Sequence, residues 1–265
     1  TPNDGSESIL IPNTPTQTAR VKIEAIGNIF FDISDVDFAI VTGQPSPTPT
    51  ATVPPSPSPS PACTPSWAPG PAFPAVAVVR AIGVFFPANG KFYAIGGRSS
   101  DTAGNNFANP FEYDPAANTW VMKSAALPDI NVNNMACGVL TVGGTPQIYC
   151  AGGSAGGGTT STARVFSYNP VTDAITVLTG DDWPGAANNT LPGGFAVSGN
   201  KLYIIGGFTI GADASAQVWQ FDPTPAVGGK WLQRQNLPVA RGYVPATAIG
   251  AMLYTGGGSM IVAAT

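Results

Sequence analysis

The chain contains no histidine, and this absence excludes more than any other feature of its composition. Without imidazole no Ser-His-Asp or Cys-His pair can form, and no histidine can hold zinc or copper. The three cysteines, Cys63, Cys137 and Cys150, are too few and too scattered for a zinc site made of cysteine alone. Within these 265 residues we therefore expect no common hydrolase chemistry, no metal and no cofactor.

Charge is also scarce. Only 10 % of the residues are charged and the net charge is −4, against roughly 25 % charged residues in an average soluble domain. This balance argues against nucleic acid or an anionic membrane as a partner.

The longest apolar stretch, 75–86, is broken by Arg80 and Gly83. It stays short of the ~18 residues that cross a membrane, and no secretory signal region is present, so we expect no membrane span in this segment.

Glycine and proline are abundant, with 32 and 27 residues, while 43 % of the chain is hydrophobic. These proportions allow a sizeable core but favour short strands joined by turns over long helices. The sequence therefore predicts an all-β protein.

Residues 1–43 contain two alternating apolar and polar runs, 21–26 and 35–40, which predict strands with one buried face. Some 35 residues cannot close a sandwich that needs about 100. The stretch 18–41 resembles the closing segment of Ig-like modules in large secreted bacterial proteins, some of them proteases. The resemblance implies that this zone forms the terminal strands of an incomplete β-sandwich domain that begins upstream.

The same zone carries an oxygen-rich patch of Asp32, Ser34, Asp35 and Asp37. Such a patch can bind Ca²⁺, but it lacks the glycine and the final glutamate of a full calcium loop. Alternating aspartates on a strand that face water are the favoured interpretation.

Residues 44–66 form a linker. Eight of the 17 residues 45–61 are proline, and such a tract stays in extended polyproline II as a semi-rigid spacer. A Pro-rich ligand for a recognition domain is the alternative, which the lack of flanking basic residues disfavours. Spacers rich in Ser, Thr and Pro also suit glycosylated stalks that face a cell wall.

From Trp67 onward the chain repeats itself. Gly-Gly doublets begin at 96, 152, 206 and 256, which gives steps of 56, 54 and 50 residues. Each is preceded by an apolar strand pattern, and the first three are followed by an aromatic segment that ends in Asp-Pro or Asn-Pro: 111–115, 165–170 and 218–223. A third strand pattern with Trp120 or Trp231 and a Leu-Pro pair follow. Trp67 and Phe73-Pro74 hold the same places in a preceding unit.

Residues 67–265 resemble the kelch family, whose period near 50 residues builds one four-stranded propeller blade. The resemblance implies a kelch-type β-propeller with about four blades present. Because kelch propellers usually have six or seven blades, we expect an incomplete ring, truncated at the C-terminus; a closed four-bladed ring is the alternative. Two departures stand out: Ile175 replaces the expected tryptophan, and three extra residues precede Trp231.

Strand direction places the long loops that follow the doublets, 98–109, 154–163 and 208–216, on one face. Binding residues concentrate on such loops. The predicted binding residues on this face are Arg80, Arg98, Asn105, Asn106, Phe107, Arg164 and Arg241. They would hold carboxylates or sugar hydroxyls at the mouth of the central channel, with Phe107 as an aromatic platform. In the alternative interpretation each arginine only ties down a neighbouring loop.

Cys137 and Cys150 flank a hairpin whose two-residue turn would be Gly143-Gly144. That turn places them directly opposite each other, which predicts a cross-strand disulfide in an oxidising compartment.

The favoured function is a non-catalytic module that binds a protein or a glycan, in a secreted or cell-surface bacterial multidomain protein. A copper oxidase of the galactose oxidase type fails because histidine is absent. A sugar mutarotase of kelch type needs only polar side chains at the mouth, where Arg80, Arg98 and Arg241 would have to converge with a carboxylate such as Glu112. A passive spacer beside an upstream protease domain is the third hypothesis.

Overall fold

The structure is a computed structural model that describes residues 10–24, 31–41, 69–74, 78–100, 107–129, 132–155 and 160–260. The chain divides into two compact units, residues 1–66 and 67–265. Cys63, Trp67, the linker 44–66 and the pair Asn105 and Asn106 lie outside the described residues. Regular structure in the described part is all strand except for one 3-10 helix, η1 (Pro184–Asn189). None of its helices is long and apolar enough to cross a membrane.

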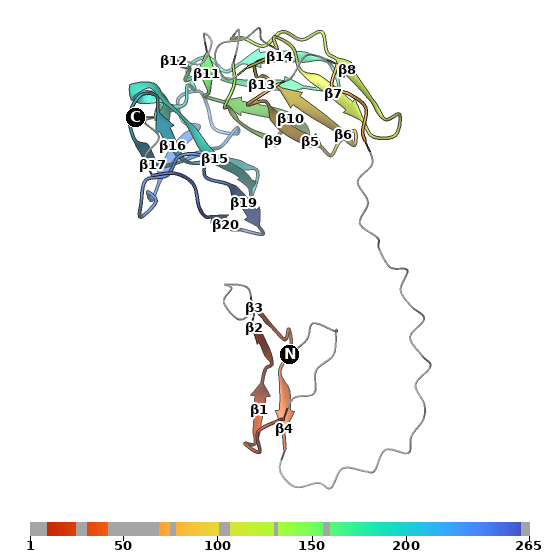
Figure 1. The fold of residues 1–265 in the computed structure, drawn as a ribbon, viewed down its shortest axis with the longest axis vertical. Helices are drawn as coiled ribbons and strands as arrows, with labels where there is room; N and C mark the ends of the chain where they lie inside the picture. The colour runs from red at the N-terminus through yellow and green to blue at the C-terminus, as the bar shows by residue number, and fades with distance from the viewer. Residues whose placement is uncertain are drawn as a thin grey trace. The chain divides into compact units, whose positions relative to one another are not determined.

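In the first unit, β1 (Thr16–Ala19) pairs antiparallel with β4 (Phe38–Ile40), and β2 (Lys22–Glu24) pairs antiparallel with β3 (Phe31–Ile33) (Figure 1). The two alternating runs of the sequence therefore each contain a strand, β2 in the first and β4 in the second. Within the described residues of this unit, each of the two sheets has two strands.

In the second unit three sheets have four antiparallel strands each, and we call them blades 1 to 3. Blade 1 is β5 (Ile82–Phe86), β6 (Lys91–Ile95), β7 (Phe111–Asp114) and β8 (Thr119–Met122). Blade 2 is β9 (Ala136–Val142), β10 (Thr145–Ala151), β13 (Val165–Asn169) and β14 (Ala174–Val177). Blade 3 is β15 (Thr190–Ser198), β16 (Lys201–Thr209), β17 (Ala214–Phe221) and β18 (Trp231–Arg234). The pair β19 (Ala246–Ile249) and β20 (Met252–Thr255) is called blade 4, and β11 (Ser154–Ala155) and β12 (Thr160–Ser161) form a small hairpin in the long loop of blade 2.

Cross-strand pairing confirms the predicted positions of the aromatic markers. Trp120 pairs with Tyr113, Ile175 with Tyr168, and Trp231 with Phe221. The three extra residues before Trp231 therefore lengthen the turn and leave the register of the blade intact.

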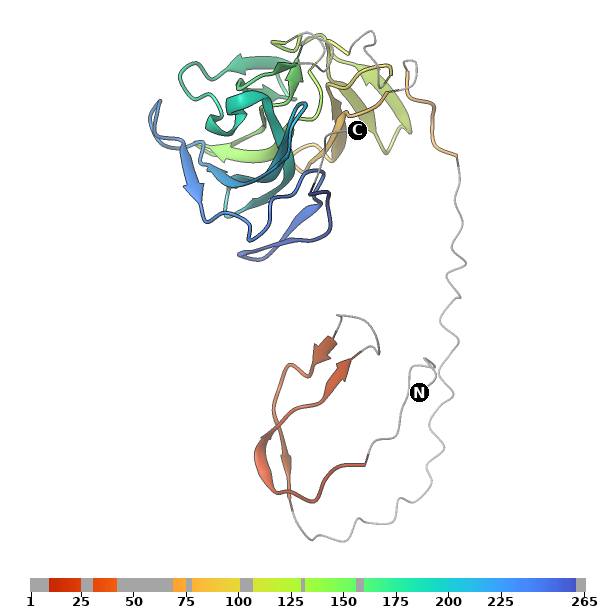
Figure 2. The same cartoon turned by 60° about the vertical axis from the view of Figure 1, so that its left-hand side comes forward.

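The blades pack through their faces, with the first strands of successive blades side by side (Figure 2). The core between blades 1 and 2 joins Phe86, Tyr93 and Ile95 of blade 1 to Phe166 and Tyr168 of blade 2, all nearly fully buried. A second core joins blades 2 and 3. Apolar surface buried between blades 1 and 2 and between blades 2 and 3 therefore stabilises the unit.

The glycine doublets make these blade junctions possible. Gly96 and Gly206, the first glycines of their doublets, have φ of 66° and 63°, in the left-handed region. A Cβ atom at either position would lie 2.4 Å from a carbonyl oxygen of the next blade's first segment, that of Val132 or Arg241. The amides of the second glycines donate to these same oxygens, each at 2.9 Å. Only glycine fits both the conformation and the close approach.

One detail of the repeat was predicted wrongly. The left-handed pair in blade 4 is Gly257-Gly258, with φ of 71° and 76°, one residue later than the predicted doublet Gly256-Gly257. Three consecutive glycines at 256–258 make the sequence alignment ambiguous there. With the structural alignment, Tyr254 takes the place that Tyr93, Tyr149 and Tyr203 hold in the other blades, three residues before the doublet.

The hairpin of β9 and β10 has the predicted register. Val142 pairs with Thr145 across Gly143 and Gly144, both of which have positive φ, and Cys137 pairs with Cys150. The two cysteines form a disulfide with a Cα–Cα distance of 4.1 Å.

Candidate functional site

The long-loop face presents a cluster of polar side chains where blades 1 and 2 meet. Each blade has a backbone bridge between the segment before its first strand and the residue that follows its doublet. In blade 1 this bridge joins Val79 to Arg98, and in blade 2 it joins Asn133 to Ser154. The five polar residues at these bridges, here called the mouth cluster, are Arg80, Arg98, Asn133, Asn134 and Ser154.

Backbone hydrogen bonds hold the mouth cluster together across the blade boundary. The amide of Asn134 donates to the carbonyl of Arg80 at 3.2 Å. Asn133 and Ser154 exchange two bonds, of 3.0 and 2.8 Å, and the Asn134 Nδ2 donates to the Asn133 Oδ1 at 2.7 Å. Arg80 and Asn134 both have left-handed backbones, with φ of 61° and 54°. Such strain tends to persist where the surroundings fix it and often accompanies function.

Burial divides the cluster into a floor and a rim. Arg98, Asn133 and Ser154 are at most 4 % exposed and form the floor, whereas Arg80 and Asn134 are half-buried. The buried Ser154 Oγ has no hydrogen-bond partner among the described residues. Buried hydroxyls rarely stay unsatisfied, so this atom suits a hydrogen bond from water or a ligand.

At the corresponding positions of blades 3 and 4 the mouth is aromatic. Phe208 follows its doublet as Arg98 does, and Tyr243 precedes its strand as Arg80 does. Their ring centroids are 5.0 Å apart, and Tyr243 is 55 % exposed with φ of 51°. The mouth therefore offers hydrogen-bonding groups on blades 1 and 2 and, on blades 3 and 4, a pair of aromatic rings of which Tyr243 is exposed and Phe208 is half-buried.

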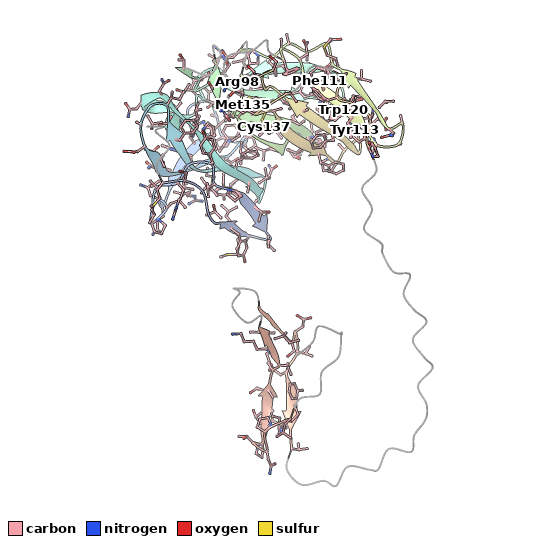
Figure 3. All side chains as sticks on the ribbon, in the orientation of Figure 1. Arg98, Phe111, Tyr113, Trp120, Met135 and Cys137 are labelled. Carbon is pink, nitrogen blue, oxygen red and sulfur yellow. A yellow bond between two sulfur atoms is a disulfide. The ribbon has the colours of Figure 1, made fainter. Side chains whose placement is uncertain are left out.

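Phe107 was predicted wrongly as an exposed platform. It is 8 % exposed and packs with Phe73 and Phe111, at centroid distances of 6.0 and 5.7 Å. Phe107 lies just before β7, and its side chain packs on the face of blade 1 that carries Phe111 and Trp120; these two are labelled in Figure 3. The aromatic contact surface at the mouth is Phe208 and Tyr243 instead.

Two of the other predicted arginines lie outside the mouth cluster. The Arg164 Nε donates to the Asp129 carboxylate at 2.8 Å, which ties the start of β13 to the segment between blades 1 and 2. This hydrogen bond raises the pKa of the Arg164 guanidinium. The Arg241 carbonyl accepts a hydrogen bond from the Gly207 amide at 2.9 Å, and the Arg241 amide donates one to the Ser215 carbonyl at 3.1 Å. Arg241 also lines a cavity between blades 3 and 4.

Glu112, the carboxylate that a mutarotase would need, belongs to a structural network. Its carboxylate accepts hydrogen bonds from Lys91 and Tyr93 at 2.6 Å each and from Lys123 at 3.3 Å. Burial opposes ionisation of Glu112, but these donors hold its pKa below the usual range, while burial and the Glu112 contact raise the pKa of Tyr93. The Tyr93 hydroxyl also accepts a bond from Asn89 in a short turn. The network therefore points toward the short-turn side, away from the arginines of the mouth.

The described residues hold no group of three or more His, Cys, Asp or Glu side chains suited to a metal. In the acidic patch of the first unit, Asp37 forms an ion pair with Arg20, and Arg20 also donates to the Ser34 carbonyl at 3.2 Å. An arginine thus takes the place that a calcium ion would need at Asp37.

Sequence reasoning missed Asn133, Asn134, Ser154 and Tyr243. The first three hold the positions of Val79, Arg80 and Arg98 in the backbone bridges. Asn133 lies 19 residues before its doublet and Val79 only 17, so counting from the doublet does not align them. Tyr243 lies 14 residues before its doublet and Arg80 lies 16, so only the bridge between Gly242 and Ser259 shows that the two are equivalent.

Comparisons with known proteins support the fold. No protein-family model matches the sequence, and no curated protein matches it either. The solved structure of YjhT, a kelch-repeat β-propeller protein, is similar with a TM-score of 0.57 and 18 % identity. The similarity covers 73 % of this chain and 63 % of YjhT. Residues 67–265 thus have the fold of kelch propeller blades. This kelch unit spans less than two thirds of YjhT, so the likeness carries the fold and nothing of YjhT's own activity.

Proposed function

We propose that the kelch unit is a non-catalytic binding module whose ligand, a glycan or a glycan-bearing protein, docks on the long-loop face. The observation that carries this proposal is the composition of the mouth. Guanidinium and amide groups on blades 1 and 2 accompany the exposed ring of Tyr243 and the half-buried ring of Phe208 on blades 3 and 4. Ligand sites typically combine aromatic surface with a few polar groups that fix orientation.

The context of the unit fits a secreted or cell-surface bacterial protein. The Cys137–Cys150 disulfide suits an oxidising compartment. The Pro-rich linker and the strands of the first unit, which resemble an Ig-like module, suit a stalk that holds the kelch unit away from a surface.

Two other functions are less well supported. A passive spacer would need none of the polar side chains of the mouth cluster. A mutarotase would need a carboxylate at the mouth, whereas the Glu112 carboxylate is bound by two lysines and a tyrosine.

The test is a glycan array probed with the 265-residue chain and three variants. Tyr243→Ala removes the exposed aromatic ring of the mouth, and Arg80→Ala removes a rim guanidinium. Tyr254→Ala is the matched control, because Tyr254 is 50 % exposed but lies on β20, away from the mouth. We expect selective binding of a few oligosaccharides that both mouth variants weaken at least about tenfold and the control leaves unchanged. Binding that Tyr254→Ala weakens equally, or no binding to any glycan, would overturn the glycan proposal.

A further inference from the structure

A groove lies at the junction of blades 2 and 3, both of which have all four strands. Its volume of about 390 Å³ lies within the range of roughly 300–1,000 Å³ that is typical of small-molecule sites. Its polar lining comes from blade 2 and its far wall from the turn between β17 and β18: Gln147, Tyr149, Ser167, Thr176, Pro223 and Lys230. None of the described residues that line it belongs to the mouth cluster.

In blade 1 a charged network occupies the corresponding place. Glu112 pairs with Tyr93 across the sheet. Ser167 pairs with Tyr149 in the same register, and each tyrosine lies three residues before its doublet. By this register, blade 2 replaces the charged side chains of blade 1 with neutral ones: Gln147 for Lys91, Ser167 for Glu112 and Leu178 for Lys123. The groove is therefore the space that the charged network takes up in blade 1.

The two tyrosines hold equivalent places at the two junctions but differ in their contacts. The Tyr93 ring centroid lies 5.8 Å from that of Tyr168 on blade 2, and the Tyr149 centroid lies 5.8 Å from that of Phe221 on blade 3. The Tyr93 hydroxyl donates to the Glu112 carboxylate at 2.6 Å. The Tyr149 hydroxyl makes no hydrogen bond to a described residue.

Two buried hydroxyls thus line the groove without a partner in the described part of the chain. Ser167 is 5 % exposed and Tyr149 is 7 % exposed, and the Ser167 side chain also lacks a hydrogen bond to any described residue. Burial raises the pKa of the Tyr149 phenol, so the phenol stays protonated at neutral pH and can both donate and accept. Because buried hydroxyls rarely remain unsatisfied, these two groups indicate a polar ligand.

The charges around the groove favour a neutral ligand. Lys230 is the single charged residue of the described lining. Its ammonium lies 3.9 Å from the Asp181 carboxylate and donates to the Pro225 carbonyl. An anion in the groove would therefore lack a free cation as partner, which is costly in a partly buried site. Hydroxyl and amide groups beside the apolar surface of Leu178 and Pro223 match the hydroxyls and C–H groups of a sugar.

We propose that this groove binds one neutral hexose residue of a glycan. The Tyr149 and Ser167 hydroxyls and the Gln147 amide hydrogen-bond the sugar hydroxyls, and Leu178 and Pro223 contact its C–H surface. The groove shares no described residue with the mouth cluster, so this inference does not rest on the proposed function.

The test is an NMR titration of the full chain with isotope-labelled Val and Leu methyl groups. The probes are the methyl glycosides of glucose, galactose and mannose. Val142 and Leu178 line the groove, so their methyl signals report whether it is occupied. We expect saturable shifts of these signals with at least one glycoside. The corresponding uronic acid should bind at least about tenfold more weakly, because its carboxylate would lie in the groove unpaired.

Substitutions locate the site. Gln147→Lys combined with Ser167→Glu rebuilds the ion pair of blade 1 and fills the groove. Thr176→Arg, at an exposed position on β14, covers the groove from outside without changing the core. Val171→Arg is the matched control, since Val171 is 74 % exposed in the turn before β14 and does not line the groove. We expect both groove variants to weaken glycoside binding at least about tenfold, and Val171→Arg and Tyr243→Ala to leave it unchanged.

The outcomes separate this inference from the proposal for the mouth. Shifts at Val142 and Leu178 that persist in Tyr243→Ala support the groove, whatever the glycan array shows for the mouth. Shifts confined to Val79 and Val244, which lie beside the mouth, would leave the proposed function standing and overturn the groove site. The groove site is also refuted if the uronic acid binds equally well or if Thr176→Arg leaves binding unchanged.

Discussion

Substitution of Gly96 by alanine should destabilise the kelch unit far more than an ordinary change of glycine to alanine. Gly96 has φ of 66° and a Cβ there would lie 2.4 Å from the Val132 carbonyl oxygen and 2.7 Å from the Met135 methyl. A left-handed alanine costs roughly 1–2 kcal/mol. The steric clash forces the backbone of the next blade to move, and overpacking of this kind costs roughly 1–3 kcal/mol more. We therefore expect a loss of roughly 2–5 kcal/mol in the free energy of unfolding.

The chain offers a matched control in Gly90. Its φ of 70° is nearly the same, but nothing lies within 4 Å of its Cβ position. Gly90→Ala should therefore cost only the conformational part, roughly 1–2 kcal/mol. Urea unfolding followed by tryptophan fluorescence measures both variants. Equal losses for the two variants would refute the argument that the doublets serve close packing between blades.

Three other predictions follow from single contacts. Replacing Cys137 and Cys150 together by serine opens a loop with a sequence separation of 13, which should lower stability by ~3 kcal/mol in thermal melts; an unchanged melting temperature would contradict this. Burial disfavours ionised Asp222, but hydrogen bonds from Lys201 and Thr224 lower its pKa from 3.8 to about 2. This contribution, about 1–2 kcal/mol after allowance for solvent screening, is complete well above pH 3.8 and lost as the pH falls toward 2. Asp222→Asn should remove that part of the acid dependence in urea titrations at pH 2 to 5, and an unaltered pH profile would count against the pairing. Phe166→Ala should cost roughly 3–5 kcal/mol by calorimetry, because Phe166 is 2 % exposed between blades 1 and 2; a loss below 1 kcal/mol would show that the junction tolerates a cavity.

Features repeated along the chain could be predicted from the sequence. The doublets recur every 50–56 residues, and an aromatic strand that ends in Asp-Pro or Asn-Pro follows each of the first three, so the order of the strands in a blade follows once one unit is understood. The Cys137–Cys150 pairing was predictable because a two-residue glycine turn fixes the register of its hairpin. Both are consequences of local chain geometry.

Side-chain exposure could not be predicted in the same way. Phe107 and Tyr243 both lie a few residues before a strand, yet Phe107 is 8 % exposed in the core of blade 1 and Tyr243 is 55 % exposed at the mouth. Which of them is buried depends on contacts with segments far away in the sequence, such as Phe73 for Phe107. Ser154 looked like a loop residue, and only the bridge to Asn133 places it in the floor of the mouth cluster.

The most direct test of the central claim, that the long-loop mouth is the ligand site, is hydrogen–deuterium exchange with the best oligosaccharide from the array. Ligand binding should slow exchange at 79–82, 132–136 and 241–244, which lead into the first strands beside the mouth. Exchange in the short turns at 88–90, 143–144 and 199–200, on the opposite face, should stay unchanged. Protection confined to those short turns, or to the first unit, would contradict the account.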